Sequence, residues 1–287
     1  MGYVEYLRAR HAFTVFAIVL TACIAFTDFS ILYGIHNAHV EHSSANRDTT
    51  YTISVAPGSK AHGKAADDED SVPISLADKD FTVPIGMLFG VAAYLAMVLA
   101  TILGTSLNKE NSRGGFAFTK PISRERLALT FIGIDLAAIV AAFSFTVLLG
   151  LASLEVLGIF GKLALEPGAA AVAAVGLGAA VMWYGLLQAA TSMRVAGGGL
   201  FVGLSWVLFF IMLPFYAITF LGPIFHGLIV AIDFFNPLAY FALVSHDDIV
   251  TTISLLGFSP GTCIAITWSL ATAACIAAIY GWKRVEV

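Results

Sequence analysis

Six stretches of about 20 or more predominantly apolar residues limit what this chain can fold into more than any other feature. A helix needs about that length to cross the hydrocarbon core of a bilayer, where its backbone polar groups must be satisfied internally. Composition agrees, since 59% of the residues are hydrophobic and only 12% are charged, against about 25% charged in ordinary globular domains. We therefore predict an all-α membrane protein with six transmembrane helices, at residues 12–34, 84–107, 127–154, 168–190, 198–221 and 262–282.

The distribution of Lys and Arg predicts how these spans are oriented, because cytoplasmic loops carry an excess of both residues. Ten of the 15 Lys and Arg residues fall in the connecting pieces that lie inside when the N-terminus is inside, although these pieces are the shorter set. We therefore expect both termini to be cytoplasmic, in a multi-pass protein of the plasma (inner) membrane of a prokaryote. The net charge of −4 argues against a nucleic-acid partner, which would require a basic surface.

The whole chain, 1–287, is predicted to form one transmembrane domain with two regions on the outer side. The first is the loop 35–83, which is the only sizeable polar region and is expected to be extracytoplasmic. The second is the segment 222–261, whose apolar runs are too short to cross the bilayer and are broken by Gly and Pro residues. We expect it to form re-entrant or interfacial helices; the alternative is a seventh span through 224–246.

The loop 108–126, between the second and third spans, carries the most specific pattern in the sequence. Charged residues alternate there with Phe116 and Phe118, which would give a short interfacial helix an apolar side. Pro121 ends such a helix, and Ser123 can cap the helix that follows. The plainer alternative is a basic anchor that only fixes the orientation of the chain.

This loop resembles the first cytoplasmic loop of the permease subunits of type-2 ABC exporters. In that family an acidic residue, a short amphipathic helix and a Pro-Ile/Val-Ser-Arg turn lead into the third span. The six spans, the basic N-terminal lead-in and the broken outer segment are similar as well. The resemblance implies a transport subunit rather than an enzyme, with a cytoplasmic coupling helix that docks on a separate ATPase. The residues that match this coupling region are Glu110, Phe116, Phe118, Lys120, Pro121, Ser123 and Arg124.

The resemblance also implies partners for the chain: an ABC ATPase subunit, a second permease subunit in a homodimer or heterodimer, and the lipid bilayer. No cofactor is expected in this chain, and ATP and Mg²⁺ would be bound by the ATPase. One stretch, 58–64, has the glycine and lysine spacing of a phosphate-binding loop. Ala65 follows it, however, where a Ser or Thr should hold Mg²⁺, so we interpret the match as chance.

Asp135 lies about two turns into the third predicted span, where exposure to lipid would be costly. It therefore either pairs with a neighbouring helix or takes part in transport. A self-contained, ion-coupled secondary transporter that uses Asp135 as its proton-carrying group is the alternative to an ATP-driven permease. An intramembrane enzyme would need Asp28 and Asp135 as a pair, but the predicted topology places Asp28 near the outer surface and Asp135 nearer the inner one.

Small residues predict where helices pack closely, because they let backbones approach each other in a membrane. Two glycines four residues apart lie on one face of a helix and form such a packing site. Gly86 and Gly90 form one in the second span, and Gly199 and Gly203 form one in the fifth. The fourth span is composed almost entirely of small residues at its start, so we expect it to pack inside the bundle or at a dimer seam.

Three histidines follow the first span at intervals of three residues: His36, His39 and His42. On a helix such positions lie close enough for two or three imidazoles to share a Zn²⁺ or Cu²⁺ ion. The alternative is a hydrated loop beside the membrane with incidental histidines.

Overall fold

The structure, a computed structural model, describes residues 2–45, 82–109, 123–192, 223–240, 242–246, 249–253 and 258–283. Within these ranges five helices are long and apolar enough to cross a membrane. They are α1 (Gly2–Ala45), α2 (Ile85–Lys109), α4 (Arg124–Val156), α5 (Ala169–Ser192) and α8 (Pro260–Lys283). Five of the six predicted spans are thus found as helices, and the predicted span 198–221 lies outside the described residues.

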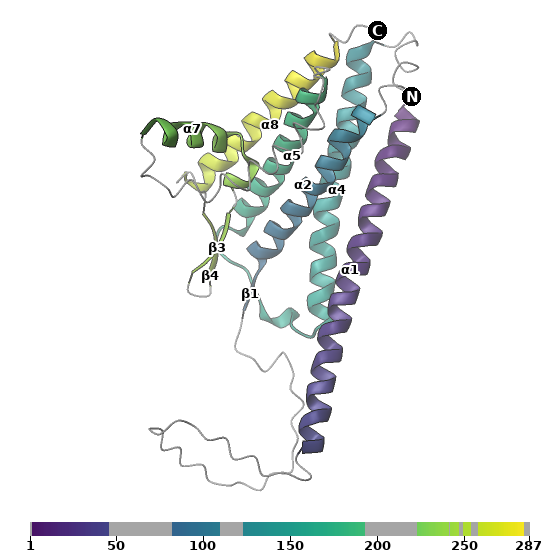
Figure 1. Ribbon diagram of the computed structural model, residues 1–287, viewed down its shortest axis with the longest axis vertical. Helices are drawn as coiled ribbons and strands as arrows, with labels where there is room; N and C mark the ends of the chain where they lie inside the picture. Colours follow the sequence, from purple (N-terminus) through teal and green to yellow (C-terminus); the bar gives the residue numbers. More distant parts are fainter. Residues whose placement is uncertain are drawn as a thin grey trace.

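Helix α1 is longer than the span predicted for it. It continues to Ala45, and therefore enters the region that was expected to be the loop 35–83. The chain between Gly34 and Ala45 contains neither Pro nor Gly, so no strong helix breaker interrupts it. Figure 1 shows α1, in purple, along one side of the bundle and projecting beyond the other helices.

Helix α5 packs against α2 on one side and α8 on the other, and all three run in the same direction. Ala93 of α2 lies against Gly176 of α5. Further along both helices, Gly104 of α2 lies against Leu187 of α5, so the two helices are parallel. The same order holds between α5 and α8, where Gly185 lies against Ala274 and Gln188 accepts a hydrogen bond from Trp282. Consequently α5 ends and α8 begins at opposite ends of the bundle (Figure 1).

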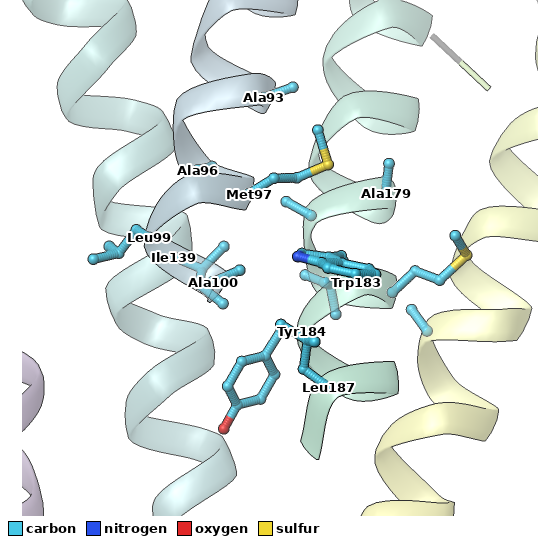
Figure 2. Close-up of a cluster of buried hydrophobic side chains, with 14 of the residues drawn as sticks. Ala93, Ala96, Met97, Leu99, Ala100, Ile139, Ala179, Trp183, Tyr184 and Leu187 are labelled. Carbon is cyan, nitrogen blue, oxygen red and sulfur yellow. The ribbon is translucent and has the colours of Figure 1, made fainter. Parts of the chain in front are cut away.

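Alanine is the most frequent residue of the hydrophobic core, which also contains many larger side chains. Figure 2 shows Trp183 and Tyr184 of α5 beside Met97 of α2, and all three are buried. The indole Nε1 of Trp183 donates a 2.9 Å hydrogen bond to the hydroxyl of Thr101 on α2. The expectation that the small-residue span packs inside is confirmed, since 67% of the residues in an 18-residue window of the α5 span are buried.

At the end of the bundle away from the N-terminus, short irregular elements connect the helices. Helix α4 ends at Val156, and Gly158 then takes a positive φ of 69°, a conformation that costs glycine little. A one-turn helix, η2 (Phe160–Lys162), follows it. Strand β2 (Leu163–Ala164) then pairs in parallel with β1 (Val83–Pro84), which joins the entrances to α5 and α2.

The segment predicted as re-entrant or interfacial helices is mixed in structure. It contains one helix, α7 (Pro223–Phe234), and a short turn of helix, η3 (Pro237–Tyr240). A hairpin follows, in which β3 (Ala242–His246) pairs antiparallel with β4 (Ile249–Ile253). A continuous seventh span through 224–246 is therefore not formed. The all-α prediction missed this hairpin, although the Ile, Val and Thr residues of β4 favour a strand.

Candidate functional site: a buried charge cluster

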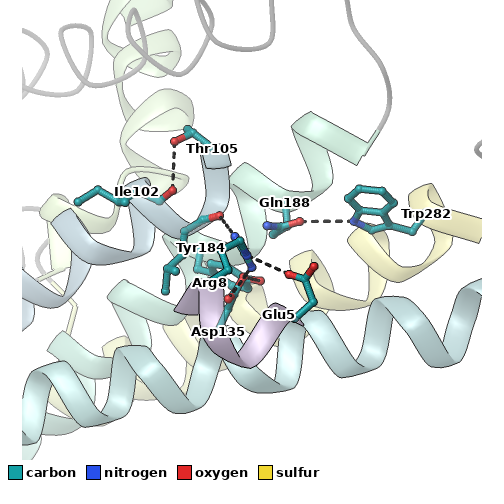
Figure 3. Close-up of polar contacts among 9 residues, drawn as sticks. Glu5, Arg8, Ile102, Thr105, Asp135, Tyr184, Gln188 and Trp282 are labelled. Atoms are coloured by element: carbon teal, nitrogen blue, oxygen red, sulfur yellow. Dashed lines mark hydrogen bonds and ion pairs between the residues drawn. The ribbon is translucent and has the colours of Figure 1, made fainter. Parts of the chain in front are cut away.

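Asp135 of α4 is fully buried and forms an ion pair with Arg8 of α1 (Figure 3). The guanidinium Nη2 of Arg8 donates to both carboxylate oxygens, at 2.8 Å to Oδ1 and 2.9 Å to Oδ2. The Arg8 side chain is itself only 14% exposed. The ionisable group that the sequence placed within a span is therefore held by a basic residue from another helix.

Two further residues complete what we call the charge cluster: Glu5, Arg8, Asp135 and Tyr184. Tyr184 of α5 donates its hydroxyl to Oδ2 of Asp135 at 2.8 Å, and Arg8 Nε donates to Glu5 at 2.9 Å. Nη1 of Arg8 also donates to the backbone carbonyl of Leu103 on α2, at 3.3 Å. The cluster thus links α1, α2, α4 and α5 at one level of the bundle.

This arrangement suits a structural tie better than a proton relay. Removing one partner of a buried ion pair leaves an uncompensated charge, which is strongly destabilising. Both oxygens of Asp135 accept hydrogen bonds from side chains of other helices, so a proton transfer would first have to break the pair with Arg8. The cluster therefore fixes the beginning of α1 against the rest of the bundle.

Sequence reasoning found Asp135 but missed its partners. It counted Arg8 only as one of the basic residues that orient the chain, and it assigned no role to Glu5 or Tyr184. A usable signal was present, because a carboxylate inside a span requires a partner. With 15 Lys and Arg residues in the chain, however, only the packing of α1 on α4 selects Arg8.

Asp28 and Asp135 do not meet. Asp28 is 9% exposed and accepts a 2.7 Å hydrogen bond from the hydroxyl of Ser153 on α4. About 20 residues of α1, or about 30 Å of helix, separate it from Arg8 and hence from Asp135. The pair required by the intramembrane-enzyme alternative is therefore not formed, in agreement with the topology argument.

Of the predicted coupling residues, the structure describes only the last two. Ser123 is the N-cap of α4, and its hydroxyl accepts a hydrogen bond from the backbone N–H of Arg126 at 3.4 Å. Arg124 is the first residue of α4. The remaining residues of the match lie outside the described residues: Glu110, Phe116, Phe118, Lys120 and Pro121.

The glycine motifs are described in part. Gly86 and Gly90 lie on buried positions of α2, and their role in packing stays a prediction, whereas Gly199 and Gly203 lie outside the described residues. Close helix approaches also occur at glycines of α5 that formed no such motif. A Cβ added at Gly176 would lie 2.5 Å from the Cβ of Ala93, and one added at Gly178 would lie 2.8 Å from the hydroxyl of Thr267.

The histidine hypothesis stays a prediction. His36, His39 and His42 lie within the backbone helix α1, but their side chains lie outside what the structure describes. Among the described residues, no group of three or more His, Cys, Asp or Glu side chains is placed to hold a metal ion.

A second buried carboxylate, Asp233 at the end of α7, was not considered from the sequence. It is fully buried, and its Oδ1 accepts a 3.2 Å hydrogen bond from the side-chain amide of Asn236. Its Oδ2 has no partner among the described residues. Burial raises the pKa of this carboxyl above its usual value, and the hydrogen bond from Asn236 opposes that shift only in part.

The chain matches no family model, and searches of curated proteins and of solved structures also give no match. Its function is therefore argued from the sequence pattern and from the geometry above.

Proposed function

We propose that this chain is the membrane-spanning permease subunit of an ATP-driven type-2 ABC exporter, in the plasma membrane of a prokaryote. It would move an unidentified substrate outward with energy from a separate ATPase subunit. The observation that carries the proposal is the Pro121-Ile-Ser-Arg124 turn at the entrance to the third span. The N-cap bond of Ser123 supports it, because it gives a residue of that turn a defined role in starting α4.

Six spans with both termini on the same side belong to this proposal. Since α5 and α8 run parallel, the chain between Ser192 and Pro260 has to return to the opposite end of the bundle. Helix α7, with 12 residues, is about 18 Å long and cannot make that crossing. The apolar stretch 198–221 is long enough, and we assign to it the remaining span, which is the fifth along the chain.

The end of the bundle at which α1 begins is the cytoplasmic end in this proposal. Helix α2 also ends there, and α4 begins there (Figure 1), so the 110–122 connection joins them on that side. Basic residues are concentrated at the same end, in accord with the positive-inside rule. In the described helices they are Arg8, Arg10, Lys109, Arg124, Arg126 and Lys283.

In this assignment the chain forms the passage and performs no bond chemistry. ATP and Mg²⁺ bind to the partner ATPase, whose movement reaches the bundle through the loop 108–126. A second permease subunit, identical or similar, completes the transport path. The exposed apolar residues of the helices face the acyl chains of the bilayer or that second subunit.

Co-purification with the ATPase tests the coupling role of the loop. The Phe116→Asp/Phe118→Asp variant should lose an ATPase that the unchanged chain retains in mild detergent, because charge would replace the apolar anchors. Phe160→Asp is the matched control: Phe160 is 46% exposed on η2, at the other end of the bundle. Equal recovery of the ATPase with all three chains would refute this loop as the coupling element.

A self-contained, ion-coupled transporter is the second candidate, and the buried carboxylate of Asp135 is the observation that favours it. It ranks lower because Arg8 and Tyr184 already occupy that carboxylate. Transport by the isolated chain in proteoliposomes without ATP, abolished by Asp135→Asn, would favour this candidate over the permease.

A further inference from the structure

Helix α1 is held to the bundle unequally along its length. Towards its beginning, Ala9 is buried, and Ala12, Phe13 and Phe16 pack against the hydrophobic core. After Phe16, no described residue of α1 takes part in that core. The second half of the α1 span therefore lies against its neighbours without contributing to the core.

The polar contacts of α1 are likewise more numerous at its beginning than further along the helix. At its beginning, the charge cluster connects α1 to three other helices through the buried pair of Arg8 and Asp135. Asp28 lies about 30 Å further along α1. Among the described side chains of α1 that follow Ala9, only that of Asp28 is buried. It accepts a single 2.7 Å hydrogen bond, from Ser153.

We propose that α1 is a hinged helix, fixed at its beginning by the charge cluster and able to swing away from α4 when the bond between Asp28 and Ser153 breaks. Breaking this bond at the outer end exposes a carboxylate and a hydroxyl to water, which can replace the lost hydrogen bond. Breaking the cluster would leave buried charge uncompensated. The weaker tie therefore opens first, and the pivot lies at the basic end.

Such a swing would open the seam between α1 and α4 on the side opposite the coupling loop. That role, an outward opening during export, rests on the proposed function. The movement itself does not, because it follows from the unequal ties. The two are therefore tested by separate experiments.

Distances between spin labels on α1 and α2 test the hinge in the full chain reconstituted in nanodiscs. The three native cysteines are replaced by alanine, and labels are placed on exposed helical residues so that packing is left intact. The outer pair is Phe29 and Met87, and the inner pair is Tyr6 and Ile102. We expect the distance distribution of the outer pair to be at least twice as wide as that of the inner pair.

Ser153→Ala should widen the outer distribution further or move it to longer distances, and leave the inner pair unchanged. Ser144→Ala, at an exposed serine of the same helix, is the matched control and should change neither pair. Equal widths at the two ends would overturn the hinge. An outer distribution that Ser153→Ala leaves unchanged would do so too, as would an effect of that variant on the inner pair. None of these outcomes depends on an ATPase, so they are distinguishable from a failure of the co-purification experiment.

Discussion

Helices α5 and α1 are both long apolar helices, yet they are held in the bundle by different means. In an 18-residue apolar window of the α5 span 67% of the residues are buried, against 6% in the corresponding window of the α1 span. Helix α5 meets its neighbours through glycine and alanine, as at Gly176 against Ala93. Helix α1 is held by a few aromatic contacts, such as Phe13 with Phe145, and by polar ties at Arg8 and Asp28.

The difference reflects how helices associate in lipid. Apolar side chains gain little by leaving lipid for a neighbouring helix, so association depends on close packing and on interhelical hydrogen bonds. Helix α5 packs closely against its neighbours from Gly176 to Leu187. Helix α1 depends on polar contacts at particular points, so its attachment can be strong at one end and weak at the other.

Arg8→Leu should have the largest effect, since it leaves Asp135 buried without its cation. We expect a loss of about 3–5 kcal/mol in the free energy of unfolding, measured by SDS-induced unfolding in mixed micelles. Adding Asp135→Asn removes the stranded charge and keeps an acceptor for Tyr184, so the double variant should recover most of that loss. If Arg8→Leu alone unfolds like the unchanged chain, α1 is not held by the cluster.

Gly176→Ala should have an intermediate effect. The new Cβ would lie 2.5 Å from the Cβ of Ala93, which is not the end of a flexible side chain, so a helix has to shift. Overpacking of this kind costs about 1–3 kcal/mol, measured by the same unfolding assay. Gly133→Ala on α4 is the control, because nothing lies within 4 Å of the added Cβ, and it should be neutral or slightly stabilising. Equal stability of the two variants would mean that α5 is not closely packed.

Ser153→Ala should have the smallest effect on stability, below about 1 kcal/mol, because water can replace the Ser153 hydroxyl as the donor to Asp28. The same SDS-unfolding assay measures the loss for Ser153→Ala and for Arg8→Leu. It therefore compares the hydrogen bond at Asp28 with the ion pair at Arg8. A loss as large as that of Arg8→Leu would show that α1 is fixed equally at both ends.

Much of the architecture was predictable from local pattern. Apolar stretches of sufficient length located five helices, and the small residues of the fourth predicted span indicated its interior position. The end of α1 was misjudged because helix continuation past residue 34 depends on the absence of breakers rather than on hydropathy. The hairpin at 242–253 was missed because short apolar runs were interpreted only as helices, although Ile249–Ile253 is rich in β-branched residues.

The sequence by itself determined that this is a membrane protein, where five of its apolar helices lie, and that Asp135 falls within one of them. Those conclusions follow from the thickness of the bilayer and the cost of a buried charge, which apply to each segment separately. The tertiary structure alone decided that Arg8 and Tyr184 both bind Asp135 and that Gly176 packs against Ala93. These are contacts between segments distant in the chain, and they depend on how the helices pack side by side rather than on any one helix.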